Sequence, residues 1–299
     1  MKNLDKRIVQ RLLNDQFPQF SSSPIKPVAV SGWDNRIFHI GQDYVARLPS
    51  AAAYASQAIK ERRWLPKLAP HLPVVIPEPI GFGQPGCGYP YHWAIYRWIP
   101  GITAFEATMD DKRSFAADVS GFLSAMHRID TEEAPAPGDH NSYRGGSLKI
   151  YDAETRTAIS LLNDRYDSTI LTEIWEAGLH SRWNADPVWV HGDVTAGNLL
   201  VGDNGRLCGV IDFGLIAAGD PACDLAIAWT YFDDESRKEF RSGLQLDDDT
   251  WLRARSWALW KAAIVRAGIS NTNAVERATA ANTIIQIVSD HSADGNLTQ

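Results

Sequence analysis

The sequence predicts an α+β fold with two lobes, a small lobe rich in antiparallel strands and a larger, mainly helical lobe. The chain has 299 residues, and at about 150 residues per domain this length suggests two domains. Short β-rich runs dominate up to residue 99, whereas helical periodicity dominates from residue 100 onward. The hydrophobic fraction of 44% is that of an ordinary globular chain. We therefore expect lobes at 1–99 and 100–299.

The predicted small lobe begins with an amphipathic helix and continues as a sheet. Residues 4–13 carry aliphatic side chains at helical spacing. The stretch 26–48 contains three short β-rich runs separated by Gly-containing turns, which predicts three antiparallel strands. Residues 55–68 favour a helix that Pro66 ends or kinks. The apolar run 92–99, closed by a Pro-Gly pair, indicates a buried strand.

The predicted large lobe is helical around one β-rich island. Apolar residues from Phe115 to Ile129 fall at offsets 0, 4, 7, 8, 11 and 14, which defines one face of a helix. The island contains strand-like runs at 188–190, 199–201 and 207–211, with a Gly-Asp-Asn-Gly turn between the last two. Residues 132–146 form a long structureless stretch, either a lid or a surface crossing. Further helices are expected over 155–166, 250–267 and 274–289.

Composition excludes several classes of partner. The formal net charge of −7 argues against a nucleic acid or an anionic membrane surface as a partner. No apolar run approaches the roughly 20 residues that cross a bilayer, and the charged N-terminus does not resemble a signal peptide. The three cysteines lack metal-ligand spacing and suit a reducing compartment. We expect a cytoplasmic protein without nucleic-acid or membrane partners.

The β-rich island carries the densest chemical signal. Asp193 is followed five positions later by Asn198, and Asp212 comes at the end of the next hairpin. Phosphoryl transfer needs a carboxylate that orients or deprotonates the acceptor hydroxyl, and oxygen ligands that hold Mg²⁺ on the nucleotide phosphates. No thiolate or histidine cluster competes for a hard cation there. The pattern predicts a phosphotransferase site.

The motifs His-Gly-Asp-Val-Thr-Ala-Gly-Asn (191–198) and Ile-Asp-Phe-Gly (211–214) resemble those of the aminoglycoside phosphotransferase family. The resemblance continues through Gly-Asp-Pro-Ala-Cys-Asp-Leu (219–225) and implies a protein-kinase-like bilobal fold that binds ATP or GTP between its lobes. It implies that Asp193 is the catalytic base and that Asn198 and Asp212 bind Mg²⁺. It also implies a supporting role for His191 and a structural role for Asp224.

The same resemblance suggests nucleotide contacts in the small lobe. Ser31 and Gly32 would form the tip of a phosphate-covering turn, although a plain hairpin turn is nearly as good an interpretation. Arg47 stands where kinases often carry a phosphate-binding Lys, and Glu61 would pair with it unless both are solvated surface charges. The stretch 96–101 would form the hinge between the lobes and contact the base through the backbone at Arg97 and Ile99. Backbone contacts do not choose between ATP and GTP.

The acceptor is expected to be a small molecule bearing a hydroxyl. Only residues 214–219 separate Phe213 from Asp220, too few for the activation segment of a protein kinase. The acidic runs 233–235 and 247–249 suit a polycationic aminoglycoside, or they cap helices. Trp229, Trp251, Trp257 and Trp260 are either core or an aromatic wall for a macrolide or sugar. An aminoglycoside is the leading acceptor class, and a macrolide or a small metabolite (sugar-, choline- or homoserine-like) is the alternative.

Two competing interpretations belong to other classes of protein. A nucleotide-binding pseudokinase would regulate a partner by shape, but Asp193, Asn198 and Asp212 are all present. The run Gly-Phe-Gly-Gln-Pro-Gly (81–86) matches a dinucleotide fingerprint, yet no helix follows to receive a pyrophosphate. We interpret that run as a hairpin loop.

Overall fold

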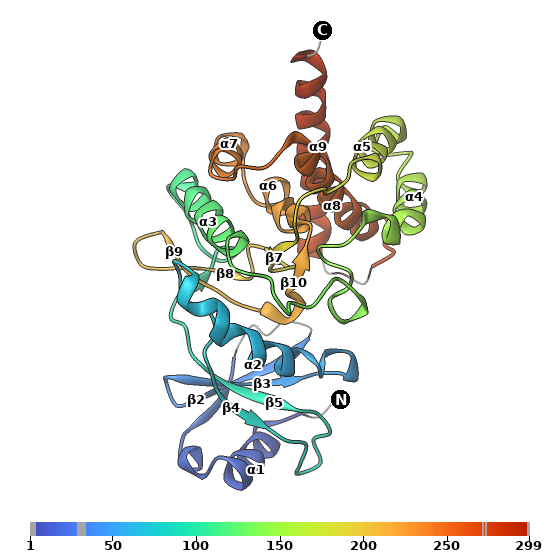
Figure 1. Cartoon of the computed structure of the whole chain (residues 1–299). Helices are drawn as coiled ribbons and strands as arrows, with labels where there is room; N and C mark the ends of the chain where they lie inside the picture. The colour runs from blue at the N-terminus through green and yellow to red at the C-terminus, as the bar shows by residue number, and fades with distance from the viewer. Residues whose placement is uncertain (1–3, 29–33, 271, 273, 298–299) are drawn as a thin grey trace. The chain divides into compact units, whose positions relative to one another are not determined.

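A computed structural model describes residues 4–28, 34–270, 272 and 274–297 of the chain (Figure 1). The described chain divides into two units. The first unit extends to Ile102 and also contains Cys208–Gly214, whereas the second comprises Thr103–Leu207 and the chain from Leu215 onward. The roles assigned to 1–99 as a nucleotide-binding lobe and to 100–299 as an acceptor lobe stay predictions.

The first unit is built on a five-stranded antiparallel sheet of order β1-β2-β3-β5-β4. The second and third antiparallel strands predicted within 26–48 are confirmed as β2 and β3. The first predicted run, 27–30, shares only Pro27 with β1, and its residues 29–30 lie outside the described part of the chain. The interpretation of 81–86 as a loop is wrong in part, because Gly81–Gly83 end a strand. The strands are β1 (Ile25–Pro27), β2 (Asn35–Ile40), β3 (Tyr44–Pro49), β4 (Pro79–Gly83) and β5 (Trp93–Arg97).

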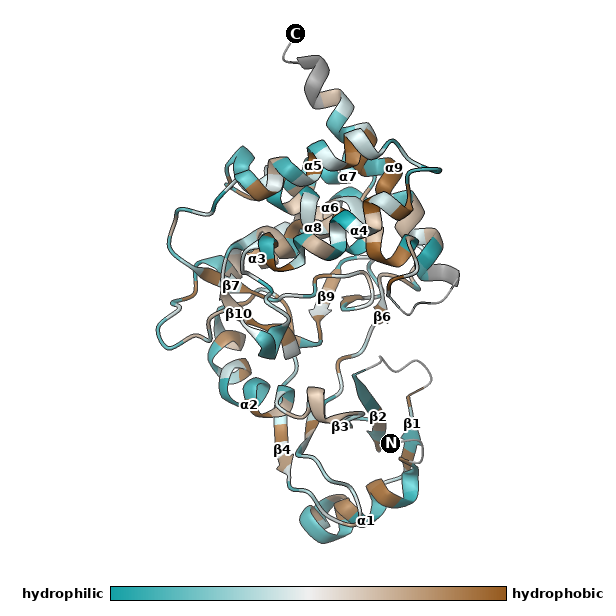
Figure 2. Cartoon of the chain, turned by 90° about the vertical axis from the view of Figure 1, so that its right-hand side faces the viewer, coloured by the Kyte–Doolittle hydropathy of each residue, from teal (hydrophilic) through white to brown (hydrophobic). Residues whose placement is uncertain are grey.

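The two faces of this sheet serve different helices, because side chains alternate along a strand. Ala46 and Leu48 of β3 join the apolar core under helix α1 (Lys6–Gln16). Arg47, between them in sequence, instead contacts Glu61 of helix α2 (Gln57–Leu68). Figure 1 shows α2 above the strands and α1 below them, and Figure 2 shows hydrophobic and hydrophilic segments on both helices. The α1 face supplies packing, and the α2 face supplies polar chemistry.

Helix α2 continues through Pro66 and ends two residues later at Leu68. A proline in a helix interior lacks the N–H that would bond four residues back. The short 3₁₀ helix η3 (Ala69–His71) follows at once. The helix thus ends at the predicted residue, 68, and the expectation that it ends at Pro66 is wrong.

The described residues of the second unit are mostly helical around α8. Helix α8 is buried along most of its length, including Trp251, Trp257 and Trp260. None of the helices in the described ranges combines the length and apolarity that a membrane span requires. The helices are α3 (Lys112–His127), α4 (Asp152–Leu161), α5 (Ser168–His180), α6 (Ile227–Thr230), α7 (Asp234–Ser242), α8 (Asp248–Arg266) and α9 (Ala274–Leu297).

Short strands lie directly before the polar motifs that begin at His191 and Asp220. Strand β7 (Val188–Val190) pairs antiparallel with β10 (Ala217–Gly219), with Val190 opposite Ala217. The predicted strands of the island are confirmed as β7, β8 (Leu199–Val201) and β9 (Leu207–Val210), whereas β10 was not predicted. The remaining strand is β6 (Ile102–Thr103).

The stretch 132–146 is a surface crossing tied down along its length. It contains the 3₁₀ helix η4 (Asp139–Asn141), and Asn141 is fully buried. The Ala218 N–H donates to the Pro135 carbonyl and the Asp220 N–H to the Gly145 carbonyl, each at 2.8 Å. These bonds fasten the crossing to the middle of β10 and to the residue that follows it.

Candidate active site

The predicted catalytic loop begins directly after β7 and is held by a buried carboxylate. Asp224 is fully buried and accepts hydrogen bonds from the backbone N–H groups of His191 at 2.6 Å and Gly192 at 2.7 Å. Burial raises the pKa of Asp224, and its interactions with His191 and Gly192 oppose that rise. His191 is also fully buried, and its Nδ1 lies 3.2 Å from the donating Asp193 N–H. The loop therefore presents Asp193 from a fixed backbone.

Gly192 is needed for this geometry. Its φ of +84° lies in the left-handed region, which L side chains rarely adopt. A Cβ at this position would lie only 2.6 Å from the Leu215 carbonyl oxygen. The glycine of the His-Gly-Asp motif thus allows the chain to turn sharply between the buried His191 and the partly exposed Asp193.

Asn198 lies beside Asp193 and orients it. The Asn198 Nδ2 group donates to the Asp193 carbonyl oxygen and to its Oδ2, each at 2.9 Å. Because the amide nitrogen is used in this way, the Oδ1 atom of Asn198 is the part suited to a cation. The structure thus brings together the predicted base and one predicted Mg²⁺ ligand within the second unit.

A second polar cluster lies in the first unit around Arg47. The guanidinium contacts Glu61 at 2.9 Å and Asp212 at 2.8 Å. The ion pair expected between Arg47 and Glu61 is therefore present, and Asp212 joins it. Glu61 is buried, and its pKa is raised by burial while Arg47 lowers it. The hydroxyl of the buried Tyr96 also donates to Glu61.

Asp212 combines a strained backbone with a partly exposed side chain. Its φ of +67° is unusual for a residue other than glycine and costs on the order of 1 kcal/mol. Its side chain is 34% exposed, against 11% for Arg47. Such strain is often found where the chain must aim a functional group.

Two neighbours of this cluster were missed by the sequence analysis. Lys60 Nζ donates to the Gly214 carbonyl at 2.8 Å, and burial lowers the pKa of Lys60 to about 8. Tyr96 was assigned only to the hinge. Strand pairing could have indicated Tyr96. Ala94 of β5 pairs with Arg47 of β3, and Tyr96, two residues after Ala94, lies on the same face of the sheet. No comparable pattern in the sequence singles out Lys60.

The oxygen donors suit a hard cation. Asp212 offers a carboxylate and Asn198 an amide oxygen, which are the ligand types that Mg²⁺ prefers. Within the described ranges, no group of three or more His, Cys, Asp or Glu side chains is arranged to hold a metal ion. Magnesium held by one or two protein ligands usually takes its remaining ligands from nucleotide phosphates and water.

The predicted hinge positions differ in the backbone groups that they offer. The Arg97 N–H donates to the Glu78 carbonyl at 3.0 Å, so a nucleotide contact there would use the Arg97 carbonyl. No acceptor among the described residues takes the Ile99 N–H. The Arg97 side chain is half-exposed and pairs with Glu78 at 2.6 Å. Ser31 and Gly32 lie outside the described residues.

The acidic runs of the second unit act mainly in local structure. Asp233 caps α7 by accepting from the Ser236 N–H at 3.0 Å, and Asp247 caps α8 by accepting from the Thr250 N–H at 2.8 Å. Their neighbours form ion pairs: Asp234 with Arg237, Glu235 with Lys238, and Asp248 with Arg241. The helix-cap interpretation of both runs is confirmed. Each of the four tryptophans, Trp229, Trp251, Trp257 and Trp260, is less than 7% exposed and belongs to the core.

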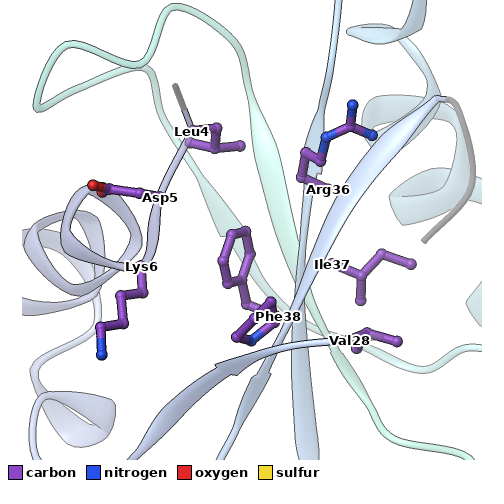
Figure 3. Close-up of a pocket in the computed structure, with 8 residues that line it drawn as sticks. Leu4, Asp5, Lys6, Val28, Arg36, Ile37 and Phe38 are labelled. Carbon is purple, nitrogen blue, oxygen red and sulfur yellow. The ribbon is translucent and has the colours of Figure 1, made fainter. Parts of the chain in front are cut away.

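A pocket of about 300 Å³ lies in the first unit (Figure 3), and none of the Arg47, Glu61 and Asp212 side chains lines it. Its lining comes from the start of α1 and from the β1–β2 region, with Phe38 projecting between them. Its one carboxylate, Asp5, caps α1 by accepting from the Arg7 N–H at 2.9 Å. This pocket therefore offers no paired acid groups for phosphoryl transfer.

Comparison with known proteins identifies the family. Residues 24–257, well over half of the chain, match the phosphotransferase enzyme family. The chain belongs to this family.

Similarity to individual proteins points the same way. An aminoglycoside 3'-phosphotransferase of Salmonella typhimurium is 28% identical over 147 residues, which are 46% of this chain and 51% of that protein. The chain thus spans about half the length of the curated relatives that it matches.

Two solved structures establish the fold. Wild-type aminoglycoside 2'-phosphotransferase-IIIa in its GDP complex has a TM-score of 0.70 and 18% identity, covering 96% of this chain and 99% of that one. Macrolide 2'-phosphotransferase MphH from Brachybacterium faecium has a TM-score of 0.58 and 20% identity, covering 94% of this chain and 98% of that one. The expected fold class, an antiparallel-sheet lobe and a larger helical lobe of protein-kinase type, is confirmed.

Proposed function

We propose that the protein transfers the γ-phosphoryl group of ATP or GTP to a hydroxyl of a small molecule. The observation that carries this proposal is the catalytic loop, where a buried Asp224 and Asn198 fix Asp193 with its carboxylate partly exposed. A carboxylate in this setting accepts the proton of the attacking hydroxyl. Asp193 is assigned that role.

The Arg47 cluster supports nucleotide binding in this proposal. Arg47 carries a guanidinium that can hold phosphate oxygens bidentately, and Glu61 with Tyr96 restricts where it points. Asp212 and Asn198 would hold Mg²⁺, which when bound neutralises charge on the transferring phosphoryl group. The Ile99 N–H and the Arg97 carbonyl are the groups assigned to the base.

The acceptor class is a separate question. An aminoglycoside is the class implied by the sequence resemblance and by the name of the 28% identical relative. A macrolide is the alternative suggested by the name of a structural neighbour. The acidic runs 233–235 and 247–249 do not favour a polycationic acceptor, because Asp233 and Asp247 cap helices. The proposal therefore stops at a small hydroxylated acceptor.

Release of nucleoside diphosphate tests this function. The wild type is assayed with Mg-ATP and with Mg-GTP over aminoglycosides, macrolides, sugars, choline and hydroxy acids. We expect at least one acceptor to stimulate release and Asp193→Asn to reduce that stimulated rate by about 100- to 10,000-fold, the range for loss of a general base. Nucleotide affinity should change little, since Asp193 acts on the acceptor.

A matched control separates the role of Asp193 from a general loss of charge. Asp203 is an exposed acid in the turn that follows β8, and Asp203→Asn should leave the stimulated rate unchanged. Equal rates for Asp193→Asn and the wild type would remove Asp193 from the base role. Nucleotide binding without stimulation by any acceptor would favour the pseudokinase interpretation.

A further inference from the structure

An aromatic group of side chains with one arginine lies in the second unit. The Arg144 Cζ atom is 5.1 Å from the ring centroid of Trp257 and 4.7 Å from that of Trp260. Tyr151 stacks on Trp260 with 4.0 Å between centroids. The Trp260 Nε1 group donates to Glu154 at 2.5 Å, which fixes the indole ring. We call Arg144, Tyr151, Trp257 and Trp260 the aromatic–arginine cluster.

Arg144 enters this cluster from a backbone position next to the catalytic loop. Its carbonyl accepts from the Asn141 Nδ2 group at 2.8 Å, and the same group donates to the Leu215 carbonyl at 3.2 Å. A Cβ built on Gly192 would lie 3.1 Å from the Cβ of Arg144. The base of the Arg144 side chain therefore abuts the residue that precedes Asp193.

Two donors of the cluster are buried and lack an acceptor among the residues that the structure describes. They are Arg144 Nη1 and Trp257 Nε1. Trp257 is only 3% exposed. Buried donors in native proteins nearly always have a partner, so an unsatisfied one requires an explanation. Both groups donate and neither accepts, so the missing partner must offer acceptor atoms.

Lys261 adds a second positive charge on the same face of α8 as Trp257, which lies four residues before it. It follows Trp260 on α8. Its pKa is lowered first by desolvation and then by the charge of Arg144, and the carboxylates of Asp193, Glu276 and Glu154 oppose that shift less strongly. Arg144 is thus the strongest charge acting on Lys261, and both lie within electrostatic reach of one another.

Three carboxylates act on Lys261: Asp193, Glu154 and Glu276. Glu154 accepts from the Trp260 indole and Glu276 from the Thr272 hydroxyl, and Asp193 is assigned to the acceptor hydroxyl. A polycationic acceptor brought to Asp193 would meet the repulsion of both Arg144 and Lys261. An anionic acceptor would meet two cations and two free donors.

We propose that Arg144 and Lys261 bind an anionic group, a carboxylate or a phosphate, of the hydroxyl-bearing acceptor. The proposal rests on the phosphotransferase function proposed above and names its acceptor class as a hydroxy acid or a sugar phosphate. Arg144 and Trp257 would donate to the anion through their two unsatisfied donors, Nη1 and Nε1. The hydroxyl to be phosphorylated would then face Asp193.

Direct binding tests the anion site without turnover. Calorimetric titration compares gluconate with glucose and glycerol 3-phosphate with glycerol, which separates carboxylate from phosphate and each anion from its neutral counterpart. We expect the wild type to bind at least one anion more tightly than its neutral counterpart. Arg144→Gln should weaken that binding at least about tenfold, as loss of a charge-assisted hydrogen bond implies.

A second test variant and a control variant accompany Arg144→Gln. Lys261→Gln removes only the second charge and should also weaken anion binding, so the result does not depend on the folding of Arg144→Gln. Arg113→Gln removes an arginine whose side chain is 64% exposed and should bind the anions like the wild type. The proposal is overturned if the wild type binds neither anion, or if all three variants bind the anions as tightly as the wild type does.

The kinase assay distinguishes failure of this proposal from failure of the function. Diphosphate release stimulated by kanamycin, together with no anion binding, would overturn the anionic acceptor and leave the phosphotransferase standing. Anion binding that depends on Arg144, together with no stimulated release by any acceptor, would leave the anion site standing and reject the kinase function.

Discussion

Two arginine–aspartate pairs of this protein share their chemistry and differ in their surroundings. In the second unit, Arg253 contacts Asp220 at 2.6 Å, and the two side chains are 5% and 10% exposed. In the first unit, Arg47 contacts Asp212 at 2.8 Å, and Asp212 is 34% exposed. The first pair is closed to solvent, whereas the second keeps its carboxylate within reach of a ligand.

The hydrogen bonds around each pair show the same contrast. Asp220 also accepts from the Ala222 N–H at 3.0 Å, and Arg253 also donates to Ser181 and Thr250. Every part of that pair is tied to local structure. Arg47 instead divides its guanidinium between Glu61 and Asp212, so it keeps one partner if Asp212 turns to another ligand. An ion pair of identical composition is therefore closed in one place and, under the proposed function, open to a ligand in another.

The same substitution in both pairs tests this contrast, and the larger effect is expected at Asp220. Asp220→Asn leaves the Arg253 charge buried without a counterion. Removing one partner of a buried pair typically costs about 3–5 kcal/mol of unfolding free energy. Urea unfolding followed by circular dichroism measures the change. A loss below about 1 kcal/mol would mean that the pair is not the structural element described here.

Asp212→Asn should have the opposite profile. Asn tolerates the left-handed φ of +67°, and Arg47 keeps Glu61, so the unfolding free energy should change by no more than about 1 kcal/mol. The affinity for Mg-nucleotide should fall about tenfold or more, because a charged oxygen ligand is lost. Titration with and without Mg²⁺ separates metal-dependent from metal-independent binding, and an unchanged Mg-nucleotide affinity would remove Asp212 from the ligand set.

A useful contrast to both pairs is His127, a partly buried ionisable group that forms no ion pair among the described residues. Burial, followed by the charge of Arg128, lowers its pKa from 6.5 to about 4. The unfolded chain therefore binds more protons between these values, so this contribution to stability is present above pH 6.5 and is lost as the pH falls toward 4. The loss is at most about 3 kcal/mol.

His127→Gln removes that proton uptake. Its unfolding free energy should depend less on pH between 6.5 and 4 than that of the wild type. Urea midpoints across this range provide the measurement. Parallel curves for the two proteins would show that His127 is not kept neutral by the fold.

The sequence predicted elements well where hydrophobic runs are bounded by turn residues. Strands β7 and β8 have the predicted bounds, because their apolar triplets end at Gly-containing motifs. Strand β4 was missed because Gly81 and Gly83 indicate a turn. A Cβ on Gly83 would lie 2.1 Å from the Trp93 ring, so the glycine permits a close contact that only the folded sheet shows.

Strand β10 was missed for a related reason. Its sequence, Ala-Ala-Gly, has low strand propensity. A Cβ on Gly219 would lie 2.2 Å from the Gly145 carbonyl oxygen. Because glycine has no Cβ, the crossing 132–146 can pack closely against this strand.

The candidate site was predicted residue by residue, including the Arg47–Glu61 pair, but its other contacts were not. The motifs indicate Asp193, Asn198 and Asp212, because phosphoryl transfer requires these residue types in this order. Tyr96 reaches Glu61 through strand pairing, and Arg144 reaches the catalytic loop through the crossing. Both contacts join distant parts of the sequence, and neither residue type identifies a role by itself.

The most direct test of the central claim is to observe the transferred phosphoryl group. Phosphorus NMR of the protein with Mg-ATP or Mg-GTP and each acceptor of the panel distinguishes a phosphate ester from free phosphate. The account predicts a new phosphomonoester resonance with at least one small hydroxylated acceptor, absent with Asp193→Asn and retained with Asp203→Asn. Nucleotide that is bound but never yields an ester, or an ester that forms equally well with Asp193→Asn, would contradict it.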